Sequence, residues 1–156
     1  MTLFHGKHII SISIMLAIFL TTISCTNRTN FQIYSTNQEQ CVTVITREEI
    51  RYIINGKYNL IPKTNFVKID ISGIDPIGDE IGVCWKTNNL EWEIVNHGSR
   101  VIENKLDTTK YKFNTSWEKD DDGIPNVKKY IQPNCGTLGF ELMMTFPKNG
   151  NIILKN

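Results

Sequence analysis

Strict alternation of apolar and polar residues is the feature that most constrains how this chain can fold. Along NFVKIDISG (residues 65–73), Val67, Ile69 and Ile71 fall on one side of an extended chain, and Lys68 and Asp70 fall on the other. A period of two predicts a β-strand with one buried face. The same period recurs in the segments EIGVCWKT, LEWEIV, YKFNTSW and GFELMMTF, at residues 80–87, 90–95, 111–117 and 139–146.

Turn signals such as DPIGD, NHGS and PKNGN separate these segments at intervals of about ten residues, which predicts about eight to ten short strands. Asn55-Gly56 lies between two alternating arms and predicts a tight hairpin. We also expect Trp117 to share a face with Tyr111 and Phe113. Helix signals are confined to TREEIRYI (residues 46–53) and IPNVKKYI (residues 124–131). The expected fold is all-β, a single antiparallel β-sandwich with at most one or two short helices.

The first 24 residues have the composition of a signal peptide. A lysine precedes the apolar run Ile9–Leu20, and small residues follow that run up to Cys25. This order is typical of a secretory signal. The run is shorter than the ~20 apolar residues of a spanning helix, although an uncleaved anchor helix is the alternative.

The sequence TISC at residues 22–25 resembles the lipobox of bacterial lipoproteins, with Ile23 and Ser24 fitting the pattern and Thr22 departing from it. The resemblance implies that Cys25 is lipidated, becomes the mature N-terminus and holds the protein at a membrane through its acyl chains. Residues 25–40 would then be the lipidated N-terminus and a polar tether, in which Phe31, Ile33 and Tyr34 are a candidate strand start, and residues 41–156 the sandwich domain. The expected localisation is the cell envelope, facing the periplasm or the outside.

A second resemblance rests on the pattern GVCW-x-T, formed by Gly82, Val83, Cys84, Trp85 and Thr87. This pattern is similar to the immunoglobulin/fibronectin-type-III-like modules common in Bacteroidota surface and secreted proteins. The resemblance implies a β-sandwich in which Trp85 packs beneath the opposite sheet. It implies a spacer or binding unit, and it supplies no catalytic residue.

Three cysteines, Cys41, Cys84 and Cys135, remain after Cys25. An extracytoplasmic compartment permits one disulfide among them, and the sequence leaves all three pairings open. No two cysteines have C-x-x-C spacing, and His97 is the only histidine after Cys25. We therefore expect no structural zinc site.

The charge balance argues against a nucleic acid partner. Lys7 is one of the 17 basic residues, which leaves 16 after the signal segment, equal to the 16 acidic residues. Binding to a phosphate backbone usually requires a basic face.

Catalytic signals are weak. A Ser–His–Asp triad needs a histidine base, and His97 lies in the predicted turn NHGS. Glu91 and Glu93 share one face of a predicted strand, and paired carboxylates can hydrolyse glycosides. Charged residues also solvate the outer face of any sheet, so we do not expect an enzyme.

The acidic segment SWEKDDDGIPNVKKY (residues 116–130) is a candidate calcium loop. With Gly123 at the turn position, oxygen ligands fall at Glu118, Asp120, Asp122 and Asn126. The part DDDGIPN resembles half of a thrombospondin type 3 repeat. Lys129 takes the last ligand position, where a carboxylate is expected, and this favours an acidic turn before a short helix.

These patterns together predict a small lipid-anchored envelope protein that serves as a non-catalytic binding or spacer module for an unknown protein or glycan. The alternative is a secreted or surface module that binds calcium or carbohydrate. A hydrolase that uses Glu91 and Glu93 is the third hypothesis.

Overall fold

The protein is described by a computed structural model that covers residues 28–75, 77–86, 92–126, 130–141, 144–150 and 152–155. These residues form eleven strands and no α-helix, with 3₁₀ geometry at Tyr130 and Ile131. The strands are β1 (Arg28–Tyr34), β2 (Cys41–Arg47), β3 (Ile50–Asn55), β4 (Phe66–Asp70), β5 (Glu80–Trp85), β6 (Trp92–Asn96), β7 (Arg100–Asn104), β8 (Tyr111–Asn114), β9 (Cys135–Glu141), β10 (Met144–Gly150) and β11 (Ile153–Lys155).

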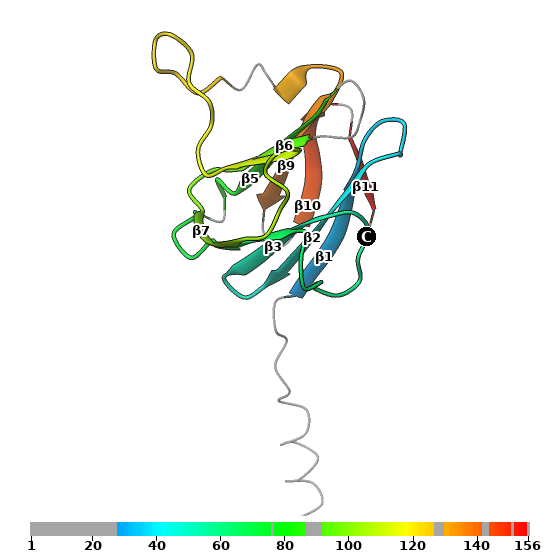
Figure 1. Cartoon of the computed structure of the whole chain (residues 1–156). Helices are drawn as coiled ribbons and strands as arrows, with labels where there is room; N and C mark the ends of the chain where they lie inside the picture. The colour runs from blue at the N-terminus through cyan, green and yellow to red at the C-terminus, as the bar shows by residue number, and fades with distance from the viewer. Residues whose placement is uncertain are drawn as a thin grey trace, which may run out of the picture.

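The strands form two sheets that pack face to face (Figure 1). The six-stranded sheet has the order β11-β1-β2-β3-β4-β7, and the five-stranded sheet has the order β10-β9-β5-β6-β8. All neighbouring strands are antiparallel except β6 and β8, which are parallel. The predicted all-β sandwich is therefore confirmed, with one parallel pair at an edge.

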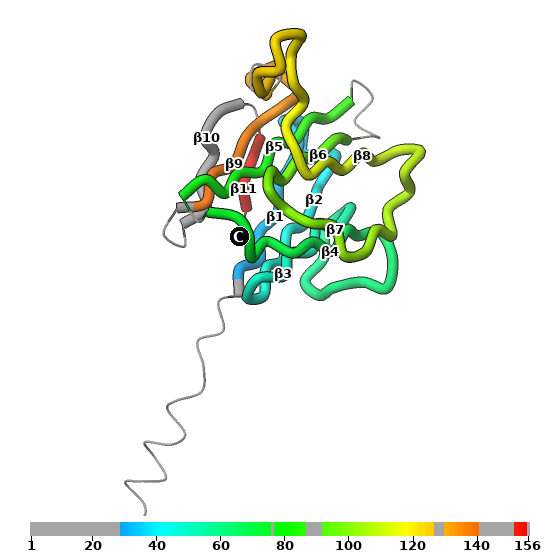
Figure 2. The backbone as a smooth tube through the Cα atoms, turned by 90° about the vertical axis from the view of Figure 1, so that its left-hand side faces the viewer, coloured from blue at the N-terminus to red at the C-terminus, as the bar shows by residue number. Residues whose placement is uncertain are grey.

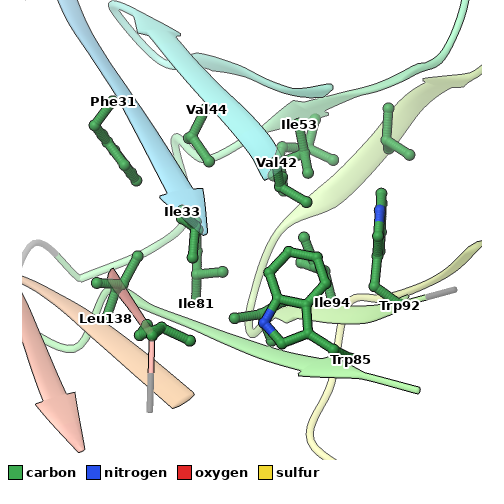
Figure 3. Close-up of a cluster of buried hydrophobic side chains, with 14 of the residues drawn as sticks. Phe31, Ile33, Val42, Val44, Ile53, Ile81, Trp85, Trp92, Ile94 and Leu138 are labelled. Carbon is green, nitrogen blue, oxygen red and sulfur yellow. The ribbon is translucent and has the colours of Figure 1, made fainter. Parts of the chain in front are cut away.

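The main hydrophobic core lies between the two sheets and follows the predicted alternation. Val67 and Ile69 point into it from β4, and Ile81, Val83 and Trp85 point into it from β5; each is at most 1 % exposed. Figure 3 shows Trp85, Trp92 and Ile94 on one side of this core and Val42, Val44 and Ile53 on the other. Because these side chains leave water together, their burial holds the sheets against each other.

The sandwich begins at β1, before the boundary expected from the sequence. Phe31 and Ile33 are 2 % and 0 % exposed, and β1 pairs with both β2 and β11. β1 thus occupies residues 28–34 of the segment expected as a tether, and includes the strand start expected at Phe31, Ile33 and Tyr34. Cys25 and the predicted signal peptide lie outside the described residues.

The predicted hairpin at Asn55-Gly56 is wrong. Gly56 has a φ of +102°, and its N–H donates to the Cys41 carbonyl at 2.8 Å. The Thr43 hydroxyl donates to the Gly56 carbonyl at 2.6 Å. The positive φ of this glycine thus directs the chain along β2 instead of back along β3, and β4 begins only at Phe66.

A tight turn joins β2 to β3. The segment TREEIRYI (residues 46–53), which spans this turn, was expected to form a short helical turn. Arg47 pairs with Ile50 across this turn, and Glu48 has a φ of 55°. Non-glycine residues adopt a positive φ only rarely, so the segment TREEIRYI carried no turn signal.

The segment GFELMMTF forms two strands instead of one. Glu141 of β9 pairs with Met144 of β10, and β10 continues through the predicted turn PKNGN to Gly150, with a register shift between Pro147 and Asn149. A period of two is the same on both arms of a hairpin, so alternation alone gave no sign of the reversal.

A smaller cluster lies on the outer face of the five-stranded sheet, around Gly82. A Cβ atom at Gly82 would lie 2.7 Å from Trp117 Cζ3 and 2.8 Å from the Tyr130 ring. Trp117 therefore packs on the outer face, whereas Tyr111 and Phe113 pack against the main core. The expectation that these three share a face is wrong because Trp117 lies beyond the end of β8. Part of the second predicted helix, residues 127–129, lies outside the described residues.

A buried polar cluster joins the two sheets at one end. Arg51 on β3 is 2 % exposed, and its two Nη atoms lie 3.0 Å and 2.6 Å from Asp79 Oδ1 and Oδ2. Arg51 Nη1 also donates to Asn96 Oδ1 at 2.6 Å, and the guanidinium carbon lies 4.3 Å from the Phe140 ring centroid. No sequence pattern indicated this inter-sheet ion pair.

Candidate functional site

A cleft of about 750 Å³ opens at the end of the five-stranded sheet where β5 ends and β6 and β8 begin. Its size falls in the usual range of small-ligand sites, roughly 300–1,000 Å³. It is lined by Cys84, Trp85, Lys86, Trp92, Glu93, Asn104, Thr108, Thr109, Lys110, Tyr111, Lys112, Phe113, Gln132, Asn134 and Cys135. The cleft thus crosses β9, β5, β6 and β8 in their order within the sheet.

The aromatic wall of the cleft is held in a fixed position. The rings of Trp92 and Tyr111 lie 4.8 Å apart with an interplanar angle of 33°. Asn55 Nδ2 donates to the Tyr111 hydroxyl at 2.8 Å, and Trp92 Nε1 donates to Asn55 Oδ1 at 3.4 Å. Trp92 is buried and Tyr111 is half-buried. Part of the Tyr111 ring is therefore exposed to the cleft, while its contacts with Trp92 and Asn55 hold it in place.

Amides and hydroxyls form the remainder of the polar lining. Asn134 Nδ2 donates to the Trp85 carbonyl, and the Trp85 N–H donates to the Asn134 carbonyl at 2.8 Å. The Thr109 hydroxyl donates to Asp107 Oδ1 at 2.6 Å. This hydrogen bond lowers the pKa of the Asp107 carboxyl. The side chains of Asn134 and Thr109 are thereby oriented before any ligand arrives.

Charges at the rim are matched in pairs. Lys112 Nζ lies 3.2 Å from Glu118 Oε1 and 3.7 Å from Glu93 Oε1. Lys110 Nζ lies 3.9 Å from Asp107 Oδ2. Two of the lining lysines therefore face three carboxylates.

A disulfide joins Cys84 and Cys135 beside the cleft, with an S–S distance of 2.08 Å. The two residues are direct partners on the antiparallel strands β5 and β9, and the 4.0 Å between their Cα atoms brings the side chains together. Of the three pairings left open by the sequence, the structure contains this one. Cys41 is a free, half-buried thiol, and burial raises its pKa.

The acidic loop forms a tight turn stabilised by Asp120. Asp120 Oδ1 accepts hydrogen bonds from the N–H groups of Asp122 and Ile124 at 3.1 Å and 2.8 Å, and Gly123 has a φ of +79°. The Asn126 N–H donates to the Glu118 carbonyl at 2.7 Å. Within the described residues, no group of three or more His, Cys, Asp or Glu side chains is placed to hold a metal ion. Calcium binding by Glu118, Asp120, Asp122 and Asn126 stays a prediction.

Of the residues considered for catalysis, the structure describes His97 and Glu93. His97 is exposed, and its ring stacks 6.4 Å from that of Trp117. Glu93 lines the cleft, where Asn114 Nδ2 donates to its Oε1 at 2.8 Å. Glu91, the predicted second carboxylate, lies outside the described residues.

Sequence reasoning did not find the cleft. Its exposed side chains come from strand ends, from the loop just before β9 and from the segment DTTKYKF (residues 107–113), which carries no recognisable motif. The aromatic stripe that includes Tyr111 and Phe113 was one available signal, although at strand spacing such a stripe usually belongs to a core. The run of small polar residues before Tyr111 was another, and it is equally typical of an ordinary loop.

Comparison of the chain with models of protein families, with curated proteins and with solved structures found no match. The resemblances of TISC, GVCW-x-T and DDDGIPN therefore remain resemblances. Among the described residues, no helix has the length and apolar character needed to cross a bilayer.

Proposed function

We propose that this protein is a small lipid-anchored protein of the cell envelope, and that it is a non-catalytic binding module whose ligand site is the cleft beside the Cys84–Cys135 disulfide. One observation carries the proposal: a cleft of about 750 Å³ in which an aromatic ring, amides and hydroxyls converge. Concave sites with an apolar wall and a few oriented polar groups are the usual form of ligand sites. The immunoglobulin-like resemblance agrees with a binding role, since it also supplies no catalytic residue.

The position of the cleft suits a protein anchored at Cys25. Arg28 at the start of β1 pairs with Arg47 at the end of β2, and the neighbouring Arg51 binds Asp79 just before β5. The start of β1 and the start of β5 therefore lie at the same end of the sandwich. The cleft lies where β5 finishes, at the opposite end; Figure 2 shows the blue start of β1 at the lower left of the sandwich, with β6 and β8 above it and to the right.

Only Thr26 and Asn27 separate Cys25 from Arg28. At ~3.3–3.6 Å per residue, the sandwich would stand within roughly 10 Å of a lipidated Cys25. Its cleft would then face away from the membrane, where a ligand in the surrounding space can reach it.

The anchor is tested by metabolic labelling of cells with an alkyne fatty acid. We expect the full chain to take up the label and to remain with the membrane fraction after a high-salt wash. The Cys25→Ala variant should be unlabelled and released, because acyl chains on Cys25 supply the membrane affinity. The Cys41→Ser variant is the matched control and should label as the parent does. Uptake of label by Cys25→Ala would contradict the anchor.

The ligand site is tested by titrating the full chain with a defined set of compounds. The protein is kept in a detergent without a sugar headgroup, and binding is followed by calorimetry and by tryptophan fluorescence, since Trp85 and Trp92 both line the cleft. The set comprises neutral hexasaccharides with glucose, xylose and mannose backbones, an oligogalacturonate and an extended uncharged hexapeptide. We expect at least one to bind and to lose affinity in cleft variants. Binding by none of them overturns the proposed binding role.

A further inference from the structure

We infer that the ligand of the cleft is a neutral oligosaccharide; this inference rests on the proposed binding role and names the chemical class of its ligand. Three properties of the cleft point to it: its charge balance, its hydrogen-bonding groups and its direction across the sheet.

The lysines of the cleft are balanced by nearby carboxylates. The lining holds the lysines Lys86, Lys110 and Lys112. Lys110 faces Asp107, and Lys112 faces Glu93 and Glu118, while Lys86 also has an interaction partner. Asp107 and Glu118 lie beside the lining and not within it; with them counted, the three lysines and the three carboxylates sum to zero. An anionic ligand would meet carboxylates beside each of these two paired lysines, and like charges in contact are unfavourable.

The hydrogen-bonding groups suit hydroxyls. The exposed polar lining includes amide and hydroxyl side chains, namely Asn104, Thr108, Thr109, Gln132 and Asn134. Amide and hydroxyl side chains both donate and accept hydrogen bonds, as a sugar hydroxyl does, whereas a carboxylate or phosphate ligand only accepts. The Thr109 hydroxyl already donates to Asp107 and offers the ligand an acceptor. Asn134 and Thr109 are already oriented by the protein, so less side-chain freedom is lost on binding.

The Tyr111 ring supplies the apolar contact. An aromatic face is negative and its edge positive, so it attracts the weakly positive C–H groups on the flat side of a pyranose. Trp92 and Asn55 hold the Tyr111 ring in place. Because the ring is fixed, its partly exposed surface acts as a platform for a sugar.

The direction of the cleft argues against a peptide strand. An extended peptide is usually bound by adding a strand along a sheet edge, through main-chain hydrogen bonds. This cleft instead crosses the inner strands β9, β5 and β6, whose backbones already pair with neighbours on both sides, and reaches an edge strand only at β8. Recognition must therefore come mainly from side chains.

The test uses the same full chain and the same compounds, with two added variants. We expect one of the neutral hexasaccharides to bind, with an affinity that changes less than twofold between about 50 and 500 mM NaCl, because no ion pair forms with the ligand. Tyr111→Ala should weaken binding about tenfold or more, as expected for an aromatic anchor. Gln132→Ala changes an exposed side chain and should weaken binding severalfold without affecting folding.

Tyr52→Ala is the matched control, because Tyr52 lies on β3 outside the cleft and packs against Phe66. It should bind the sugar as the parent does. Preferential binding of the oligogalacturonate or of the hexapeptide, lost in Gln132→Ala, would overturn this inference and leave the binding role intact. Binding by no compound overturns both. Equal weakening by Tyr52→Ala and Gln132→Ala would place the sugar outside the cleft and also overturn the inference.

Discussion

Replacing Arg51 by methionine is expected to lower the free energy of unfolding by about 3–5 kcal/mol, the usual cost of removing one partner of a buried ion pair. The Arg51 and Asp79 side chains are 3 % and 10 % exposed. Without the guanidinium, the Asp79 carboxylate would keep Asn96 as a hydrogen-bond partner but would lose its countercharge. Urea denaturation of the parent and the variant, followed by tryptophan fluorescence, measures the change.

The matched control is Arg100→Met. Arg100 Nη2 lies 2.7 Å from Asp70 Oδ2, almost the distance found at Arg51, but its side chain is 80 % exposed. An exposed pair of this kind contributes about 0–1 kcal/mol. If Arg100→Met and Arg51→Met prove equally destabilising, burial is not what makes the Arg51–Asp79 pair important.

A double variant separates loss of the pair from loss of packing. Arg51→Met combined with Asp79→Leu removes both charges, and apolar replacement of a whole buried pair is often neutral or stabilising. We expect the double variant to recover at least half of the stability lost in Arg51→Met. Additive losses would instead show that the two side chains act independently.

The fold class could be predicted because alternation in β4 and β5 is a direct consequence of a sheet with one buried face. Val67 and Ile69 are buried where the pattern placed them. The same signal failed where the chain reverses direction. Gly56 was expected to close a hairpin, yet its positive φ serves a contact with β2, and no local pattern distinguishes these two uses of a glycine.

The candidate site could not be predicted, because its parts become neighbours only through strand order. Tyr111 at the start of β8 and Asn134 just before β9 are far apart in the sequence. They line the same cleft because β5 and β6 lie between β9 and β8 in the sheet. The disulfide depends on the same order. Cys84 and Cys135 are 51 residues apart, and only the register of β5 on β9 selects them over the pairings with Cys41.

Removing that disulfide is the second change with a large expected effect. A cross-link spanning 51 residues restricts the unfolded chain, and loop-closure entropy puts its contribution at about 4 kcal/mol. We expect the Cys84→Ala/Cys135→Ala variant to lose about 2–4 kcal/mol of stability in urea denaturation. Peptide mapping of the parent without reduction should recover the Cys84–Cys135 peptide pair.

Cys41→Ser distinguishes this pairing from the other two. Cys41 is half-buried and forms no disulfide, so its conversion to serine should cost less than about 1 kcal/mol, in the range of ordinary partly exposed substitutions. Burial raises the pKa of the Cys41 thiol, which leaves little thiolate at neutral pH, so alkylation should be slow until the protein unfolds. A loss in Cys41→Ser as large as that in the double variant would mean that Cys41 is bridged, and the register of β5 on β9 would then have to be wrong.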